Sequence, residues 1–479
     1  MQTMKRANTK MTEPTPSASI LAEEGGEAQA GVSGDEAREY SIRAKFTEFD
    51  LPNLPVSDDL AIVPTVNGSM FLRYGKHAYY FYDFRARKCL RVEISHRAII
   101  APGMAVFLQS LGRRNTLGAK LNLLRERFHY GFTFTEQIML MTVPHCITAM
   151  GDDRFLVNLW SYVGYIEIDC AARTIKYLRR AGQEETAVLG SQQWVSRCSG
   201  DIYYITYSLP ESWKKIADVR HSVSCKILKE SPVDHATTVI WSGELSDYLH
   251  DILINKTEQY CVVCELGMFQ NEENKTLPSK VLILDMKSGT HWVIEEFIVA
   301  AHAQFDPVEP DVIYFSNHNF KFIPGSFLQL LRDATYALEF TGPASVYKYR
   351  LTPDGPQRLG VFTDPEMFRL TNFHVFVHRG ERVIAAMGFP NFIYIASADT
   401  MQMIRKITVE NQKSWKHLFR KPPCFIGTFS PSTDGESLYV QTTRSFQVVS
   451  VADGEATGIE SLLLNHTAPN HMQTVVSEM

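Results

Sequence analysis

Four histidines stand at one recurring position along this sequence, and their side chains suit two kinds of chemistry. His145, His250, His302 and His374 each open a short apolar run that ends in a polar turn, about five or six residues later, and a second apolar run follows. Imidazole is the commonest protein ligand for transition metals and a proton carrier near neutral pH. If the runs are inner strands of a ring of sheets, we expect the four imidazoles to converge on a divalent metal ion such as Mn, Fe or Zn.

Residues that end the second apolar run of each unit are expected to ring the same place. They are polar or aromatic, namely Trp160, Tyr207, Glu265, Asn317, His318 and Arg444. Glu265 and His318 are candidate proton-transfer groups, and Arg444 is a candidate clamp for a substrate anion. Tyr207 and Trp160 are candidate stacking surfaces. Gln193 and Cys424 occupy the histidine position in two further units.

The elements that must position these side chains are short strands. Runs rich in aromatic and β-branched residues recur between turn signals, as in DIYYITYSL and FIYIASADT, and seven units of four such runs can be counted. The pattern predicts an all-β fold, a seven-bladed β-propeller with two helical insertions and a disordered N-terminal tail. A six- or eight-bladed ring and a two-domain β-sandwich are the alternatives.

Composition divides the chain into three parts. Residues 1–50 are largely rich in Ala, Gly, Glu and Ser, so we expect them to be disordered, and 51–460 form the propeller. A tail follows at 461–479. Within the propeller, 101–130 has helical spacing and a basic face, and 323–340 is a second predicted helix. The latter lies between the second and third strands of its blade, where it could be a lid over the histidines or a packed decoration.

Bulk properties exclude several function classes. The chain of 479 residues has a formal net charge of -5, which argues against a nucleic-acid-binding surface. No apolar stretch approaches about 18 residues, so no integral membrane association is expected. The eight cysteines are mostly scattered, and Cys261 and Cys264 lie in an apparent strand, which favours reduced thiols and a cytoplasmic location. The expected partner is a small-molecule substrate, and the oligomeric state stays open.

One segment resembles a known family of propeller enzymes. Residues 302–318, HAQFDPVEPDVIYFSNH, are similar to a blade segment of oligogalacturonate lyases. In that family histidines and a glutamine bind a divalent metal, and a histidine or similar base removes a proton. The resemblance implies metal ligation by His302 and Gln304 and draws attention to His318. It covers one blade of seven.

A second segment resembles the carotenoid cleavage oxygenases. Residues 249–263, LHDILINKTEQYCVV, are similar to the His-Asp strand of that family, whose seven-bladed members hold ferrous iron with four histidines. The family's closing histidine near the C-terminus, followed by glycine, is missing here.

These observations favour a metal-dependent enzyme with a histidine-lined axial site, a lyase or a related proton-transfer enzyme. Iron-dependent oxidative cleavage is one alternative. A non-catalytic propeller that serves as a protein-interaction platform is another, because a single histidine on an apolar strand is usually a hydrogen-bonded core residue.

Overall fold

The fold is known here from a computed structural model. It describes residues 22–23, 27–29, 41–50, 62–64, 70–74, 78–83, 86, 88–97, 147–151, 153–158, 164–180, 187–196, 198–208, 223–245, 249–265, 279–297, 300–324, 336–367, 372–410, 426–442 and 446–458.

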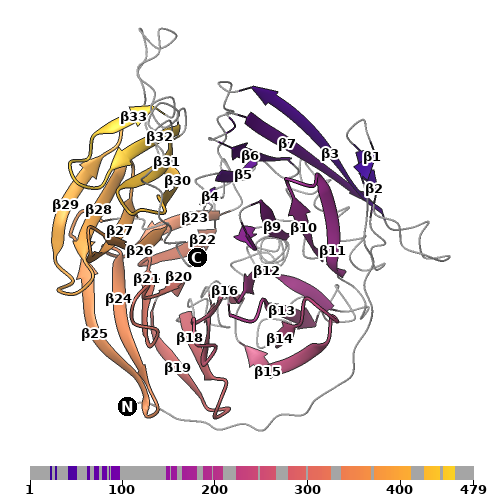
Figure 1. The fold of residues 1–479 in the computed structure, drawn as a ribbon. Helices are drawn as coiled ribbons and strands as arrows, with labels where there is room; N and C mark the ends of the chain where they lie inside the picture. The colour runs from indigo at the N-terminus through magenta and orange to yellow at the C-terminus, as the bar shows by residue number, and fades with distance from the viewer. Residues whose placement is uncertain are drawn as a thin grey trace.

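Seven antiparallel sheets are arranged around a central axis, as Figure 1 shows. We number them as blades 1 to 7 in chain order. Blade 1 contains β4 (Ile62–Pro64), β5 (Met70–Tyr74), β6 (Ala78–Asp83) and β7 (Lys88–Arg97); blade 2 contains β8 (Ile147–Ala149), β9 (Arg154–Asn158), β10 (Gly164–Asp169) and β11 (Thr174–Arg180). Blade 3 contains β12 (Ala187–Val195), β13 (Ile202–Ser208), β14 (Val223–Glu230) and β15 (Thr237–Leu245).

The later blades follow the same order. Blade 4 contains β16 (Leu249–Ile254), β17 (Tyr260–Glu265), β18 (Ser279–Asp285) and β19 (His291–Phe297); blade 5 contains β20 (Ala300–Phe305), β21 (Val312–Asn317), β24 (Ser345–Thr352) and β25 (Gly355–Thr363). Blade 6 contains β26 (Phe373–His378), β27 (Glu381–Gly388), β28 (Phe392–Ser397) and β29 (Met403–Thr408); blade 7 contains β30 (Ile426–Pro431), β31 (Ser437–Thr442), β32 (Phe446–Ser450) and β33 (Ala456–Gly458).

The ring is closed by contacts between the innermost strands. They touch in the order β4, β8, β12, β16, β20, β26 and β30, and β30 touches β4 again. Seven blades in a closed ring confirm the predicted propeller. Blade 1 is extended on its outer side by β3 (Ser41–Asp50), β2 (Glu27–Gln29) and β1 (Ala22–Glu23). No described blade combines strands from the two ends of the chain.

Strands in the middle of a blade are buried on both faces, because each blade packs between two others. Strand β17 shows the consequence, since its residues from Cys261 to Cys264 are fully buried. Burial raises the pKa of the Cys261 and Cys264 thiols. No disulfide joins any two of the six described cysteines.

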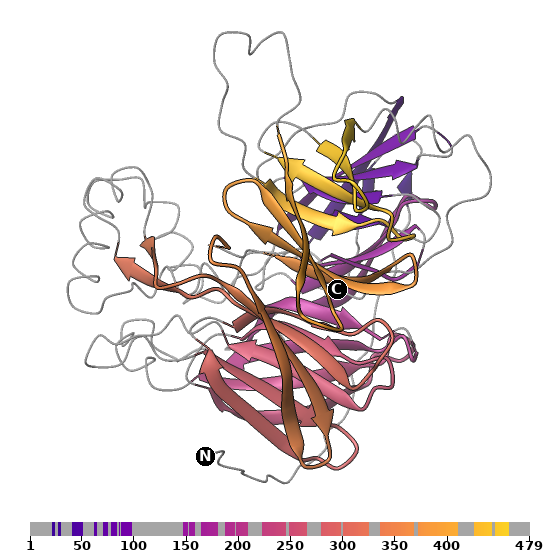
Figure 2. The ribbon, with the colours of Figure 1, turned by 90° about the vertical axis from the view of Figure 1, so that its left-hand side faces the viewer.

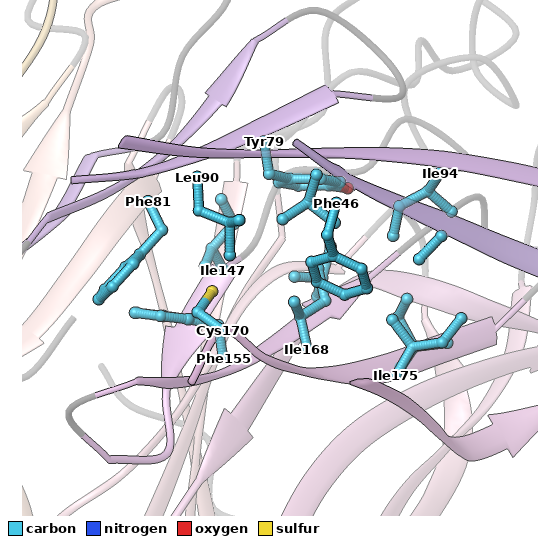
Figure 3. Close-up of a cluster of buried hydrophobic side chains, with 14 residues drawn as sticks. Phe46, Tyr79, Phe81, Leu90, Ile94, Ile147, Phe155, Ile168, Cys170 and Ile175 are labelled. Atoms are coloured by element: carbon cyan, nitrogen blue, oxygen red, sulfur yellow. The ribbon is translucent and has the colours of Figure 1, made fainter. Parts of the chain in front are cut away.

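Apolar clusters join neighbouring blades. Figure 3 shows the cluster between blades 1 and 2, where Phe81 and Leu90 of blade 1 meet Phe155 and Ile168 of blade 2. The Phe81 and Phe155 rings lie 5.8 Å apart between centroids. The Cys170 thiol is buried in the same cluster.

The two faces of the propeller differ in their connections. We call the mouth face the one on which inner strands begin and second strands end; the opposite face carries the turns from first to second strands. On this turn face polar side chains link adjacent blades. Asn255 donates to the Pro310 carbonyl over 2.9 Å, between blades 4 and 5. His378 contacts the Gly435 carbonyl over 2.9 Å, between blades 6 and 7.

The prediction of a helix at 323–340 is wrong at both ends of that segment. There the chain forms a separate two-stranded sheet of β22 (Phe320–Pro324) and β23 (Tyr336–Phe340). Figure 2 shows this hairpin projecting from the blades. Alternating apolar positions satisfy a strand as well as a helix over so short a run, so the periodicity did not discriminate. No helix occurs among the residues that the structure describes, and the predicted helix at 101–130 lies outside them.

The segment 1–50, which composition predicts to be disordered, contains β1, β2 and β3, so that prediction does not hold for these strands. The longest of them is β3. Its whole length pairs with β7, and Ala44 and Phe46 are buried against the neighbouring blade. The tail 461–479 lies outside the described residues. Within the described part, no helix is long and apolar enough to span a membrane.

Candidate functional site

Three of the predicted histidines have described side chains, and all three lie at the mouth-face end of blades 5 and 6. His302 is in the inner strand β20, His318 directly follows the second strand β21, and His374 is in the inner strand β26. His318 and His374 are buried, and His302 is half-buried. The ring centroids of His302 and His318 are 5.6 Å apart. His374 is close enough to His302 for the two imidazoles to interact electrostatically.

The recurring histidine position coincides with a β-bulge in two blades. In β16 His250 is the extra residue between Leu249 and Asp251, which pair with successive residues of β17. In β20 the register shifts between Ala301 and Gln304, across His302. Bulges re-aim side chains and are frequent beside functional sites.

His302 itself has a left-handed backbone, with φ of 50°. A non-glycine residue in this region carries a conformational cost of about 1–3 kcal/mol, which the surrounding structure must offset. The residue with the strained backbone, His302, therefore also has the most accessible imidazole of the three. It lies within the bulge of β20.

His374 is held as a neutral imidazole in one orientation. Its Nε2 lies 3.0 Å from the Phe429 carbonyl oxygen of blade 7, which can only accept, so Nε2 carries the proton. Burial lowers the pKa of His374 to about 4; the Phe429 hydrogen bond opposes this and the nearby His302 adds to it. Nδ1 then bears a lone pair, and this buried atom has no hydrogen-bond partner within the described part of the chain. A fixed N–H donor to a carbonyl with a free opposite nitrogen is the usual state of a metal-ligating histidine.

His318 is oriented by its own strand. The Ser316 hydroxyl lies 3.2 Å from His318 Nε2, and both side chains are buried. Asn317, between them, is buried too. This set supplies a hydroxyl, an amide and an imidazole at the end of one strand. An imidazole held by a neighbouring hydroxyl and facing a second imidazole suits proton transfer.

Gln304, assigned by resemblance as a metal ligand, has a different role in the structure. Its Nε2 donates to the Val375 carbonyl over 2.9 Å and its Oε1 accepts from the Val375 amide over 2.8 Å. Both ends of the amide are thus engaged by the backbone of the next blade's inner strand. The geometry does not support metal ligation by Gln304, because a side-chain amide on a buried strand edge is satisfied first by main-chain groups.

Gln193, at the histidine position of blade 3, is buried in β12. Most of the other predicted site residues lie outside the described part of the structure. His145 and Arg444 lie outside the described residues, as do Trp160 and Cys424. The side chains of His250, Tyr207 and Glu265 are likewise outside the description, although their backbones lie in β16, β13 and β17.

Two residues at the mouth were missed in the sequence. Asp251, beside His250, is buried and accepts a hydrogen bond from the Ala303 amide over 3.3 Å, which places its carboxylate next to the His302 bulge. The Asn372 amide nitrogen lies 3.4 Å from His374 Nε2. The signal for Asp251 was present, since an acidic residue interrupts the apolar run LHDILI.

These donors have the right chemistry for a divalent transition metal, but the set is incomplete within the described chain. No group of three or more His, Cys, Asp or Glu side chains is arranged to hold a metal among the residues whose placement is described. Among the described residues, the His302 and His318 rings lie side by side here, and His374 adds an unpartnered nitrogen.

No protein family and no curated protein matches this sequence. Among solved structures, an oligogalacturonate lyase from Vibrio parahaemolyticus is similar at 10% identity, over 83% of this chain and 93% of the other, with a TM-score of 0.44. An oligogalacturonate lyase in complex with manganese is similar at 10% identity, over 96% and 100%, with a TM-score of 0.44. A dihydro-heme d1 dehydrogenase is similar at 9% identity, over 95% and 74%, with a TM-score of 0.42. Likenesses this remote carry no argument about activity.

Proposed function

We propose that this propeller is a metal-dependent enzyme of the lyase or proton-transfer class, with its active site at the mouth face of blades 5 and 6. The observation that carries the proposal is the state of His374. It is buried and neutral, its Nε2 donates to the Phe429 carbonyl, and its Nδ1 lone pair has no hydrogen-bond partner among the described residues. An unsatisfied buried acceptor costs about 1–3 kcal/mol, and a bound metal ion would satisfy this nitrogen.

His374 and His302 are the described residues that would hold the ion. Neutral imidazole is the form that ligates metals, and the depressed pKa of His374 keeps it neutral throughout the physiological range. A bound divalent ion would polarise a carbonyl or carboxylate of the substrate and so acidify the adjacent C–H bond. His250 and His145, by their place in the sequence, are the proposed further ligands.

His318 is the proposed proton-transfer residue. Ser316 fixes its ring through Nε2, and the His302 ring lies 5.6 Å away between centroids. A ring so held keeps one orientation toward a bound substrate, which is the condition for efficient proton transfer. The substrate class is a small molecule with an acidic C–H bond beside a carbonyl or carboxylate.

The test separates metal binding from proton transfer. We expect the purified full-length protein to contain a stoichiometric divalent metal by elemental analysis. H302A/H374A should lose the metal and still fold, because a propeller is stabilised mainly by contacts between sheets. H318Q should keep the metal and lose the exchange of substrate C–H protons with deuterated water, followed by NMR on a panel of carboxylate-bearing sugars and hydroxy acids.

A metal-free wild-type protein whose double variant unfolds would contradict the proposal and make these histidines structural. The matched control is H291Q. His291 begins the outer strand β19 of blade 4, away from the mouth-face histidines, and its replacement should change neither metal content nor exchange.

One observation favours a protein-interaction platform as the second candidate. Large apolar side chains are exposed on the outermost strands of three successive blades, at Val293 of β19, Leu359 of β25, and Met403 and Ile404 of β29. Exposed apolar groups gathered on one side of a protein are typical of interaction surfaces. A platform predicts that L359D and I404D abolish capture of a partner while H302A/H374A has no effect.

A further inference from the structure

Blades 5 and 6 are joined at the candidate site by one side-chain amide. Gln304 of β20 is 4% exposed and makes two hydrogen bonds to a single residue of β26, Val375, at 2.8 Å and 2.9 Å. Val375 directly follows His374, and Gln304 comes two residues after His302. These two hydrogen bonds therefore join the two strand segments that carry the proposed metal ligands.

These two hydrogen bonds act where the main chains of the two inner strands are not paired with each other. Strands β20 and β26 belong to different sheets, so no ladder of main-chain hydrogen bonds joins them. Apolar packing between sheets is not directional and permits small sliding movements. Two hydrogen bonds from one planar amide to a backbone N–H and C=O fix both distance and orientation.

The bulge in β20 makes this constraint more important. His302 has a left-handed backbone and lies in the segment where the β20 register shifts, so the pairing with β21 does not fix its position directly. The next regularly paired residue is Gln304, opposite Tyr314. On the other side, His374 is held by Phe429 of blade 7, and the Val375 backbone is the part of its strand that Gln304 contacts.

We propose that Gln304 is a positioning residue of the histidine site: its amide sets His374 of blade 6 against His302 of blade 5, without contacting metal or substrate. This inference rests on the proposed function for its use, but the geometric role can be tested without it. Hydrogen-bond partners that lie just beyond the ligands in this way orient the imidazoles.

The test compares two links across the same pair of blades. Q304M replaces the amide by an apolar side chain of similar length. The matched control is K348M, because Lys348 of β24 donates to the Ala398 carbonyl of blade 6 over 2.8 Å and also spans the interface. Lys348 has no contact with the three histidines in the described structure. Two measurements are made on full-length protein: the affinity for Zn²⁺ alone by calorimetry, and the imidazole nitrogen NMR signals of the metal-free protein, assigned with H374Q and H302Q.

We expect Q304M to weaken Zn²⁺ binding by about 10–100-fold, the usual effect of losing an outer-shell partner. In the metal-free protein, the His374 nitrogens should change from one fixed tautomer to an averaged signal. K348M should leave both measurements unchanged, whatever it does to thermal stability.

Equal effects of Q304M and K348M would overturn the proposal, since they would show general loosening of the interface. Unchanged affinity and unchanged imidazole signals in Q304M would overturn it as well. If wild type binds no Zn²⁺, the proposed metal function fails, and the imidazole signals alone decide the role of Gln304. If Q304M does not fold, Q304E takes its place, because its carboxylate keeps the acceptor for the Val375 amide and loses only the donor.

Discussion

The interface between blades 1 and 2 and the interface between blades 5 and 6 are built in different ways. The first is an apolar cluster of Tyr79, Phe81 and Phe155 with aliphatic neighbours, shown in Figure 3. The ion pair of Arg173 with Glu48 also crosses this interface, but it is exposed. The second also has an apolar cluster, but polar links cross it from one end to the other. Gln304 clamps Val375, Lys348 reaches Ala398, and Arg382 reaches Asp306, which is fully buried.

The difference indicates that some interfaces in the ring mainly provide stability, whereas others also fix the geometry of side chains. Apolar contacts contribute stability in proportion to buried area, with little preference for one exact register. Buried hydrogen bonds contribute less, but they penalise any displacement that leaves a partner unsatisfied. Polar links are therefore expected where side chains from two blades must keep a defined geometry, and the histidines lie at this polar interface.

The largest expected effect is on the apolar interface. Phe155→Ala removes a ring with no solvent exposure from the cluster of Figure 3 and should lower the free energy of unfolding by about 3–5 kcal/mol in urea titrations. The imidazole NMR signals of His302 and His374 should not change. Val233→Ala is the control, because that side chain is 90% exposed and its loss should cost less than about 0.5 kcal/mol. A change at the histidines would refute the separation of the two interfaces.

The second prediction concerns pH. Burial lowers the pKa of His374 from 6.5 to about 4 in the folded protein. Between these values the unfolded chain binds a proton that the folded protein does not, so stability is full above about pH 6.5 and falls as the pH drops toward 4. The total loss is on the order of 3 kcal/mol, from about 1.4 kcal/mol per pH unit.

Unfolding titrations at a series of pH values check this, with H374Q as the comparison. The glutamine variant should be less stable at neutral pH and should lack this part of the acid-side slope. A wild-type slope that survives unchanged in H374Q would assign the acid sensitivity to other groups.

The third prediction tests the polar network on the turn face. Arg382→Met removes the guanidinium that bonds to Asp306 and to Glu309 and Asp399, and should lower stability by roughly 1.5–3 kcal/mol, the range for hydrogen bonds to charged groups. Arg379→Met is the matched control. Its guanidinium pairs with Glu436 across blades 6 and 7, but the side chain is 64% exposed, so the expected loss is about 0–1 kcal/mol. Similar losses in the two variants would mean that burial does not distinguish these links.

The smallest stability effect is expected from removing the hairpin of β22 and β23. It forms its own sheet, and its ends are already joined by the hydrogen bond from the Thr341 amide to the Asn319 carbonyl at 2.8 Å. Replacing residues 320–340 by a short Gly-containing turn should leave the melting temperature nearly unchanged. If the hairpin is a lid, as its place directly after His318 suggests, substrate affinity should fall. Unaltered binding and turnover would reduce it to a decoration.

Much of the propeller could be predicted from the sequence because blades repeat. Each unit carries short apolar runs and turn residues at similar spacing, as in LDMKSGT and VADGEA, and the blade order follows from chain order. The hairpin at 320–340 could not be predicted in this way, since its short runs fit strand and helix alike. Strand β3 was missed because its alternation, in SIRAKFTEFD, is attached to a long polar segment.

The candidate site, too, could be predicted from the sequence only in part. By itself the sequence determined that polar residues recur near the start of inner strands, because that position in a blade always faces the channel mouth or the next blade. Only the tertiary structure decided which of these two environments each side chain meets. His302 lies within the register shift of β20, and Gln304 forms hydrogen bonds with the Val375 backbone. One nitrogen of His374 is hydrogen-bonded to the Phe429 carbonyl. A shift of one residue in a strand exchanges its two faces, and the bulges that cause such shifts depend on contacts between blades that are distant in sequence.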